Sequence, residues 1–232
     1  MDAAAGLDDV RGFQKWQLPR GNLSTSQTAS RPTAIPMPLH VSQICLDDLR
    51  ERFPWLLPHH KNKRGEIKAS VDDKKPIVPV VERHVASFDV HIFEPFRRFK
   101  PIEGLEIIPL PVMHGEDLVS YGFAFTVGNT NCVYLSDISR MLDETLDYIL
   151  KSLPPTDILV VDALHPQREN AVHFNMEEAL RLVEKIRPRE MTYLVGMNCD
   201  SFLPHEEMNQ QLRRKYGNVQ LAHDGLVIAA SK

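Results

Sequence analysis

The order of hydrophobic and polar positions divides the chain into an irregular first third and a regularly patterned remainder. Short apolar runs there alternate with longer segments in which apolar residues recur every three to four positions, patterns typical of strands and amphipathic helices. The runs predict strands at 77–81, 88–93, 105–112, 122–127, 132–135, 158–161 and 191–195, with closing strands within 219–229. Helices are predicted at 46–53, 139–153, after Asn175 and at 205–216.

Two local signals fix how some of these elements connect. Gly128-Asn129-Thr130-Asn131 separates two apolar runs, as expected for a β-hairpin. Asn175, with Glu178 three residues later, forms a capping box at the start of a helix. Because hairpins and helical crossovers occur together, we predict a mixed α/β layered structure.

The remaining segments are expected to be loops within one domain that spans residues 1–232. Residues 12–34 are rich in Ser, Thr, Gly and Pro, and residues 57–76 form a basic and polar excursion. We expect both to be irregular.

Composition and charge restrict the partners and the cellular compartment that we expect for this protein. The net charge of −4 gives no bulk attraction to nucleic acid, and no apolar run is long enough to span a bilayer. Three cysteines without CxxC spacing are typical of a reducing compartment. We therefore expect a cytoplasmic protein with neither a membrane nor a nucleic acid as its partner.

Residues able to bind a metal or move a proton follow several of the predicted strands. They are His114, Asp137, Asp162, His165 with His173, and Cys199. Singly, each has an ordinary explanation: a histidine bonds within its loop, and an aspartate forms a turn or caps a helix. Repeated at strand ends, they indicate a site for Zn²⁺, Mn²⁺ or Fe. The sequence contains no GxGxxG, P-loop or GxSxG motif, and the segment at His205 lacks the second histidine of a zincin.

In combination these motifs resemble the metallo-β-lactamase-fold hydrolases. The segment His114-Gly115 and the hairpin ending Tyr134-Leu135-Ser136-Asp137 resemble the second half of that fold. Asp162-Ala163-Leu164-His165-Pro166, His173-Phe174-Asn175 and Ala222-His223-Asp224-Gly225-Leu226 resemble its PhnP-like phosphodiesterase branch. The resemblance implies an αββα sandwich, two divalent ions (Zn or Mn), and a small cyclic phosphate or nucleotide diester as substrate.

The chain's first residues also enter this resemblance. Met1-Asp2 and Gly6-Leu7-Asp8-Asp9 resemble the end of the family's His-x-His-x-Asp motif and the segment that follows it. The resemblance then implies a chain truncated inside the motif, without its N-terminal strands and with impaired activity. An ordinary start at Met1 is the alternative.

The resemblance also implies a role for each candidate residue. His114 corresponds to a histidine ligand of the first metal, Asp2 to a ligand of the second, and Asp137 to a catalytic carboxylate that bridges both. His173, which precedes a helix N-terminus favourable to phosphate, corresponds to a catalytic histidine that contacts the substrate or protonates the leaving oxygen. His165 is expected to line the substrate pocket. Cys199 stands where a histidine ligand is usual, so it either replaces that ligand or marks its loss, with His205 as a second candidate.

Three functions follow as hypotheses. The first is a phosphodiesterase, impaired in this chain, acting on a small-molecule phosphate ester. The second is a catalytically inactive binding protein, and the third is an ester or thioester hydrolase. A homodimer is left open.

Overall fold

The computed structural model describes residues 6–17, 33–57 and 85–230. The chain separates into two compact units, Met1–Phe93 and Glu94–Lys232. Each unit is described by itself, and the prediction of a single domain over 1–232 stays a prediction. No helix within the described ranges is long and apolar enough to cross a membrane.

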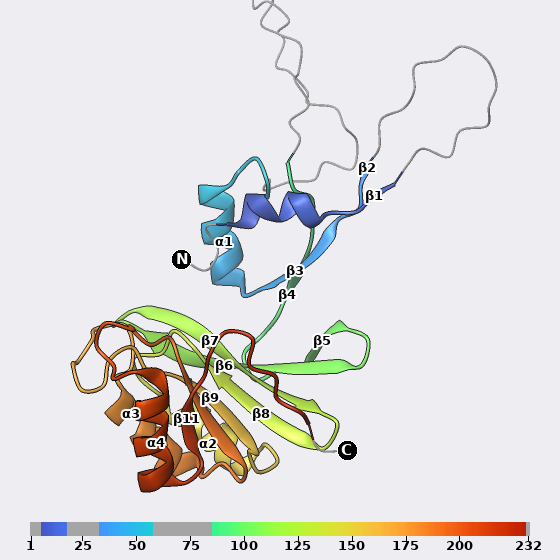
Figure 1. Ribbon diagram of the computed structural model, residues 1–232. Helices are drawn as coiled ribbons and strands as arrows, with labels where there is room; N and C mark the ends of the chain where they lie inside the picture. Colours follow the sequence, from blue (N-terminus) through green and yellow to red (C-terminus); the bar gives the residue numbers. More distant parts are fainter. Residues whose placement is uncertain (1–5, 18–32, 58–84, 231–232) are drawn as a thin grey trace, which may run out of the picture. The chain divides into compact units, whose positions relative to one another are not determined.

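A seven-stranded sheet forms the centre of the second unit, in the order β11-β10-β9-β8-β7-β6-β5 (Figure 1). Strands β5 to β8 form an antiparallel meander, whereas β8, β9, β10 and β11 run parallel. The strands are β5 Phe99–Ile102, β6 Leu105–His114, β7 Leu118–Val127, β8 Thr130–Leu135, β9 Ile158–Asp162, β10 Met191–Val195 and β11 Val219–Leu221. The parallel strands therefore end at one common edge of the sheet.

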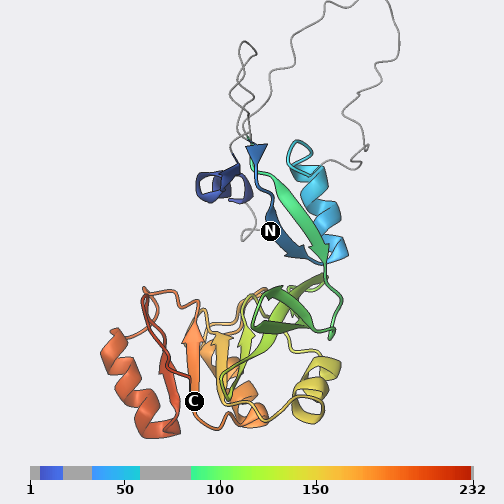
Figure 2. The same ribbon diagram turned by 90° about the vertical axis from the view of Figure 1, so that its right-hand side faces the viewer.

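Three helices cover one face of this sheet: α2 Asp143–Lys151, α3 Met176–Ile186 and α4 His205–Tyr216 (Figures 1 and 2). The core between them is apolar and contains Leu135, Leu159 and Leu194, which are fully buried. Helix α3 shows why the sequence folds this way. Its capping box forms as predicted, and its apolar stripe packs into the core.

The first unit is smaller and is built on a parallel pair, β3 Met37–Val41 with β4 Phe88–Ile92, beside helix α1 Gln43–Arg52. It also contains the 3-10 helix η2 Leu7–Phe13 and the short pair β1 Trp16–Gln17 and β2 Thr33–Ala34. The side chain of Gln14 is buried and joins the segments, because its amide donates to the carbonyls of Ile35 and Ser87.

Most predicted elements are confirmed, with small differences at their ends. Helix α1 starts behind Ser42, which accepts a hydrogen bond from the Cys45 amide. Helix α2 is shorter than the predicted 139–153, because the residues before it pair with β6. The predicted strand 77–81 and loop residues 18–32 and 58–76 lie outside the described residues.

Two predictions were wrong in detail. Within the predicted loop 12–34, Trp16–Gln17 forms a strand because it pairs with Thr33–Ala34. The closing segment 219–229 contains one strand, β11, and no second strand among its described residues. The chain turns there, with the Leu226 amide donating to the carbonyl of His223, so the later apolar residues pair with no strand.

Candidate metal centre

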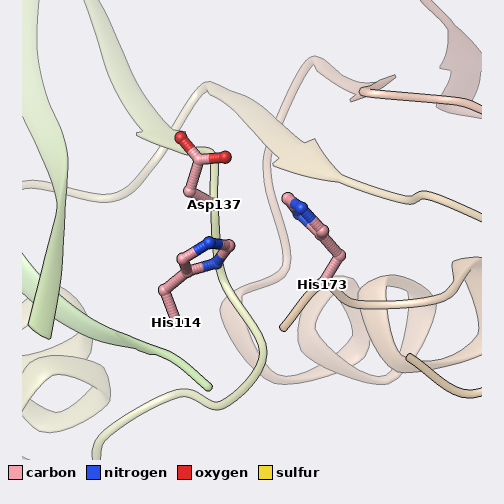
Figure 3. Close-up of side chains that lie close together, drawn as sticks. All are labelled: His114, Asp137 and His173. Atoms are coloured by element: carbon pink, nitrogen blue, oxygen red, sulfur yellow. The ribbon is translucent and has the colours of Figure 1, made fainter. Parts of the chain in front are cut away.

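Three of the predicted site residues converge at the carboxyl edge of the parallel strands. One ligand atom from each of His114, Asp137 and His173 lies within 4.8 Å of the other two. Figure 3 shows the three side chains directed into one space from separate segments. His114 ends β6, Asp137 follows β8, and His173 precedes α3. All three are partly buried. We call these three residues the metal group.

Backbone hydrogen bonds between the neighbours of these residues explain why they meet. The amide of Ser139 donates to the carbonyl of Met113 at 2.7 Å, which joins the Asp137 segment to the end of β6. The amide of Phe174 donates to the carbonyl of Ile138 at 2.6 Å, which joins the same segment to the His173 loop. The Asp137 segment is therefore held between the other two.

Asp137 itself adopts a left-handed backbone conformation, with φ of 53°. Aspartate is one of the few non-glycine residues that adopt this region with little penalty. This turn lies between the end of β8 and residues Ile138 and Ser139, which make the two backbone hydrogen bonds described above. It directs the carboxylate toward the histidines.

Both histidines are oriented by a hydrogen bond at Nδ1. The Nδ1 atom of His114 lies 2.7 Å from the carbonyl oxygen of Val172, and that of His173 lies 2.6 Å from a carboxylate oxygen of Asp162. Because these oxygens accept, each ring donates through Nδ1 and leaves Nε2 for another partner. The two rings meet edge to face, with centroids 4.9 Å apart.

This donor set fits a divalent metal ion. Two imidazoles and a carboxylate match the three protein ligands of a catalytic zinc site, which keeps one position open, and they also suit Mn²⁺. The acceptors on Nδ1 are the outer partners that fix a metal-binding imidazole in the correct tautomer. The residues present could therefore hold one ion at His114 and Asp137, with His173 either binding it or facing it.

Asp162 is the buried partner behind His173, with 3% of its surface exposed. Burial raises the pKa of its carboxyl group, the nearby His173 opposes that rise, and the Asp137 carboxylate adds to it. Gly196, at φ of 74°, follows β10 and lies against this carboxylate. A Cβ atom at position 196 would clash with Asp162 Oδ1.

Three backbone amides at the start of α3 are engaged in hydrogen bonds within the protein. The Asn175 side chain accepts from the Glu178 amide, and the Glu178 side chain accepts from the Asn175 amide. The Met176 amide donates to the His165 carbonyl. These three amides are engaged, so phosphate binding by His173 at this helix end stays a prediction, while its position in the metal group is established.

The other predicted site residues are not part of the metal group. Asp2 lies outside the described residues. Cys199 is exposed on the loop after β10, with Sγ 3.9 Å from the carbonyl of Met197. His165 is buried, and its Nδ1 lies 3.0 Å from the Ser201 hydroxyl. Metal binding by Asp2 and Cys199 and substrate binding by His165 stay predictions.

Sequence reasoning undervalued two residues. The sequence places Asp162 among the residues able to bind a metal or move a proton but assigns it no role in the site, and it assigns none to Gly196. The available signal for Asp162 was its place directly after the unbroken apolar run 158–161, which predicts a buried carboxylate in need of a partner.

Comparison with known proteins agrees with this geometry. Residues 1–195 match the family model of the β-lactamase superfamily domain. A crystal structure of a diphosphatase from the PhnP family is 25% identical with a TM-score of 0.59, over 84% of this chain and 58% of that chain. Zn²⁺-bound PqqB from Methylobacterium extorquens shares the fold, at 13% identity and a TM-score of 0.53, over 84% of this chain and 65% of that one. No curated protein matches the chain significantly.

The chain thus spans 58% of the length of the PhnP-family structure that it resembles. The family model covers most of its length, including all three residues of the metal group. The mixed sheet and its helices have the expected metallo-β-lactamase fold. The chain therefore belongs to the β-lactamase superfamily, whose members of this fold are metal-dependent hydrolases.

Proposed function

We propose that this protein is a metal-dependent phosphodiesterase in which His173, held by Asp162, donates a proton to the leaving oxygen. The observation that carries the proposal is the pairing of His173 with a buried carboxylate, directly across from His114 and Asp137. An imidazole with a carboxylate behind it and a possible metal ion in front is suited to general acid catalysis.

His114 and Asp137 are the residues proposed to hold the ion. A divalent ion at this position would supply Lewis-acid polarisation of a phosphoryl oxygen and activation of water. His114 contributes Nε2, because its Nδ1 hydrogen is engaged by the Val172 carbonyl. Asp137 contributes its carboxylate, which also offsets the positive charge of the ion.

His173 is proposed to act through Nε2. With Nδ1 donating to Asp162, a protonated His173 ring carries its second hydrogen on Nε2 and presents it toward His114 and Asp137. Transfer of that hydrogen to the leaving oxygen neutralises the charge that develops as the phosphorus–oxygen bond breaks. The Asp162 carboxylate stabilises the imidazolium before transfer and holds the ring direction afterwards.

A small phosphate ester is the proposed substrate, either a cyclic phosphate or a nucleotide diester. Likeness to a PhnP-family diphosphatase supports chemistry at phosphorus. The net charge of −4 disfavours a long polyanion such as nucleic acid. All three cysteines are free, which is consistent with the proposed cytoplasmic location.

We further propose that the 232-residue chain works slowly. Two-metal hydrolases need ligands for both ions, whereas the metal group offers three donor atoms. A second ion requires donors from elsewhere, such as Asp2.

The test is an assay of the purified chain with added Zn²⁺ or Mn²⁺ and with a chelator. The substrates are a ribose cyclic phosphate, bis(p-nitrophenyl) phosphate, p-nitrophenyl acetate and an acyl thioester. We expect metal-dependent release from both phosphodiesters, and His173→Gln should lower the release from the ribose cyclic phosphate, whose leaving oxygen needs a proton, by about 10²–10⁴-fold. Preference for the acetate or thioester would favour the ester hydrolase, and binding of a phosphodiester without turnover would favour the binding protein. Either result overturns the proposal.

A further inference from the structure

A single side chain, Asn170, connects the backbone positions that orient both histidines. Its Oδ1 atom accepts hydrogen bonds from the amide of Val172 at 2.9 Å and from the amide of His173 at 3.1 Å. The carbonyl of Val172 then accepts from His114 Nδ1 at 2.7 Å. The Asn170 oxygen therefore fixes the acceptor for one histidine and the backbone of the other.

The loop segment around Asn170 is largely exposed. Residues 163–175 contain no helix or strand, and Arg168, Glu169, Ala171 and Val172 are exposed while Asn170 is partly buried. Exposed loops with few packing contacts sample several backbone conformations. A shift of the Val172 carbonyl would remove the acceptor that keeps the hydrogen of His114 on Nδ1, and a neutral imidazole would then populate both tautomers.

We infer that Asn170 is a positioning residue that sets the tautomer of His114 and the direction of His173. The inference rests on the proposed function, in which these two rings act at a metal ion. Asn170 touches neither the metal position nor the substrate. It acts through the Val172 and His173 peptides, and only its acceptor oxygen is required.

The requirement for an acceptor alone gives a sharp pair of variants. Asn170→Ala removes the oxygen, whereas Asn170→Asp keeps it. Asn218→Ala is the control, because the Asn218 side chain also hydrogen-bonds to the backbone, donating to the Pro188 carbonyl. Asn218 precedes β11, which is parallel to β10, so it lies at the opposite edge of the sheet from the metal group.

The first measurement uses the metal-free full chain labelled with ¹⁵N, at about pH 8, above the ordinary imidazole pKa. Two-bond ¹H–¹⁵N correlation spectra report the tautomer of each ring, and His114→Gln assigns the His114 signals. We expect the Nδ1–H tautomer in the unchanged protein, in Asn170→Asp and in Asn218→Ala, and a mixture in Asn170→Ala. A pure Nδ1–H tautomer in Asn170→Ala would overturn the inference. So would a mixture in Asn170→Asp.

The second measurement is Zn²⁺ affinity by titration, with thermal unfolding of each variant as the check on folding. The Asn170→Ala variant should bind Zn²⁺ about tenfold more weakly, which is the low end of the loss seen when the hydrogen-bond partner of a metal ligand is removed. The Asn170→Asp variant should bind Zn²⁺ as tightly as the unchanged protein. Equal affinities in a folded Asn170→Ala contradict the inference. If the unchanged protein binds neither Zn²⁺ nor Mn²⁺, the proposed function fails, while the tautomer spectra still decide the role of Asn170.

Discussion

His173 donates its Nδ1 hydrogen to a carboxylate oxygen of Asp162 at 2.6 Å, and the side chain of Asp162 is 4% exposed where that of His173 is 25% exposed. The pair is therefore buried at its Asp162 end and accessible to solvent at its His173 end. A ring nitrogen of His173 lies within 4.8 Å of the ligand atoms of His114 and Asp137. A proton relayed to substrate must leave through that end, because Asp162 is enclosed by the sheet and by Gly196.

Replacing Asp162 by Asn should lower turnover by about 10²–10⁴-fold, the usual contribution of general acid catalysis. The neutral amide no longer stabilises the imidazolium of His173. The decrease should be greater for alkyl phosphodiesters than for p-nitrophenyl esters, whose leaving group needs no proton. The measurement is kcat for both substrate types. Asp143→Asn, at an exposed position at the start of α2, serves as the control. Equal losses on both substrates would argue that Asp162 has only a structural role.

Gly196→Ala should displace the Asp162 carboxylate, since the new Cβ atom clashes with Oδ1. Misplacement of a catalytic group by about 1 Å lowers activity about a hundredfold. Gly217→Ala is a matched control, because Gly217 also has a positive φ of 75°, but a Cβ atom at position 217 would meet nothing within 4 Å. Both variants place a side chain at a positive φ near 75°, so kcat after correction for folded protein is compared with and without the clash. Similar kcat values in the two would contradict the assigned role of Gly196.

Substitution of the two histidines should separate metal binding from proton transfer. His114→Gln is expected to weaken Zn²⁺ binding by more than about a hundredfold, beyond the loss from removing an outer partner. His173→Gln should leave the affinity near that of the unchanged protein and lower kcat by about 10²–10⁴-fold. Zinc titration and steady-state kinetics measure the two effects. A loss of affinity in His173→Gln equal to that in His114→Gln would show that His173 is a ligand.

Asp157 should make the stability of the sheet sensitive to acid. Its buried carboxylate accepts from the Asn131 amide at 2.8 Å and from Arg189 Nε at 2.6 Å. The Asn131 hydrogen bond first, and then the Arg189 guanidinium, hold the pKa of this carboxyl group below its ordinary value. Because the pKa is lower in the folded state, the stabilisation is complete at neutral pH. It is lost as pH falls below about 4, through the folded-state value.

Asp157→Asn should therefore reduce the free energy of unfolding by about 1.5–3 kcal/mol at neutral pH, the range for hydrogen bonds to charged groups. The deficit should shrink in acid, where the Asp157 carboxyl of the unchanged protein is protonated. Urea unfolding followed by circular dichroism at several pH values measures both. The exposed Asp47→Asn variant, on α1, is the comparison. A deficit that stays constant with pH would contradict this assignment.

Local sequence signals determined the elements of this protein. The capping box at Asn175 and the run of residues 205–216 gave helix positions that the structure reproduces, because capping and amphipathic periodicity act within a few residues. The order of motifs also led correctly to the metallo-β-lactamase fold. Where local signals failed, as in residues 226–229, an apolar run lacked a neighbouring strand to pair with.

Only the tertiary structure decided which polar residues work together. His173 is 11 residues from Asp162, and His114 is 58 residues from Val172, yet each pair is joined by a hydrogen bond. The periodicity of apolar residues indicates only whether a single position is buried or exposed. These pairs depend instead on the strand order and on the backbone hydrogen bonds that hold the Asp137 segment between the end of β6 and the His173 loop. The sequence therefore supplied the chemical groups of the site, and the sheet topology selected His114, Asp137 and His173 from among them.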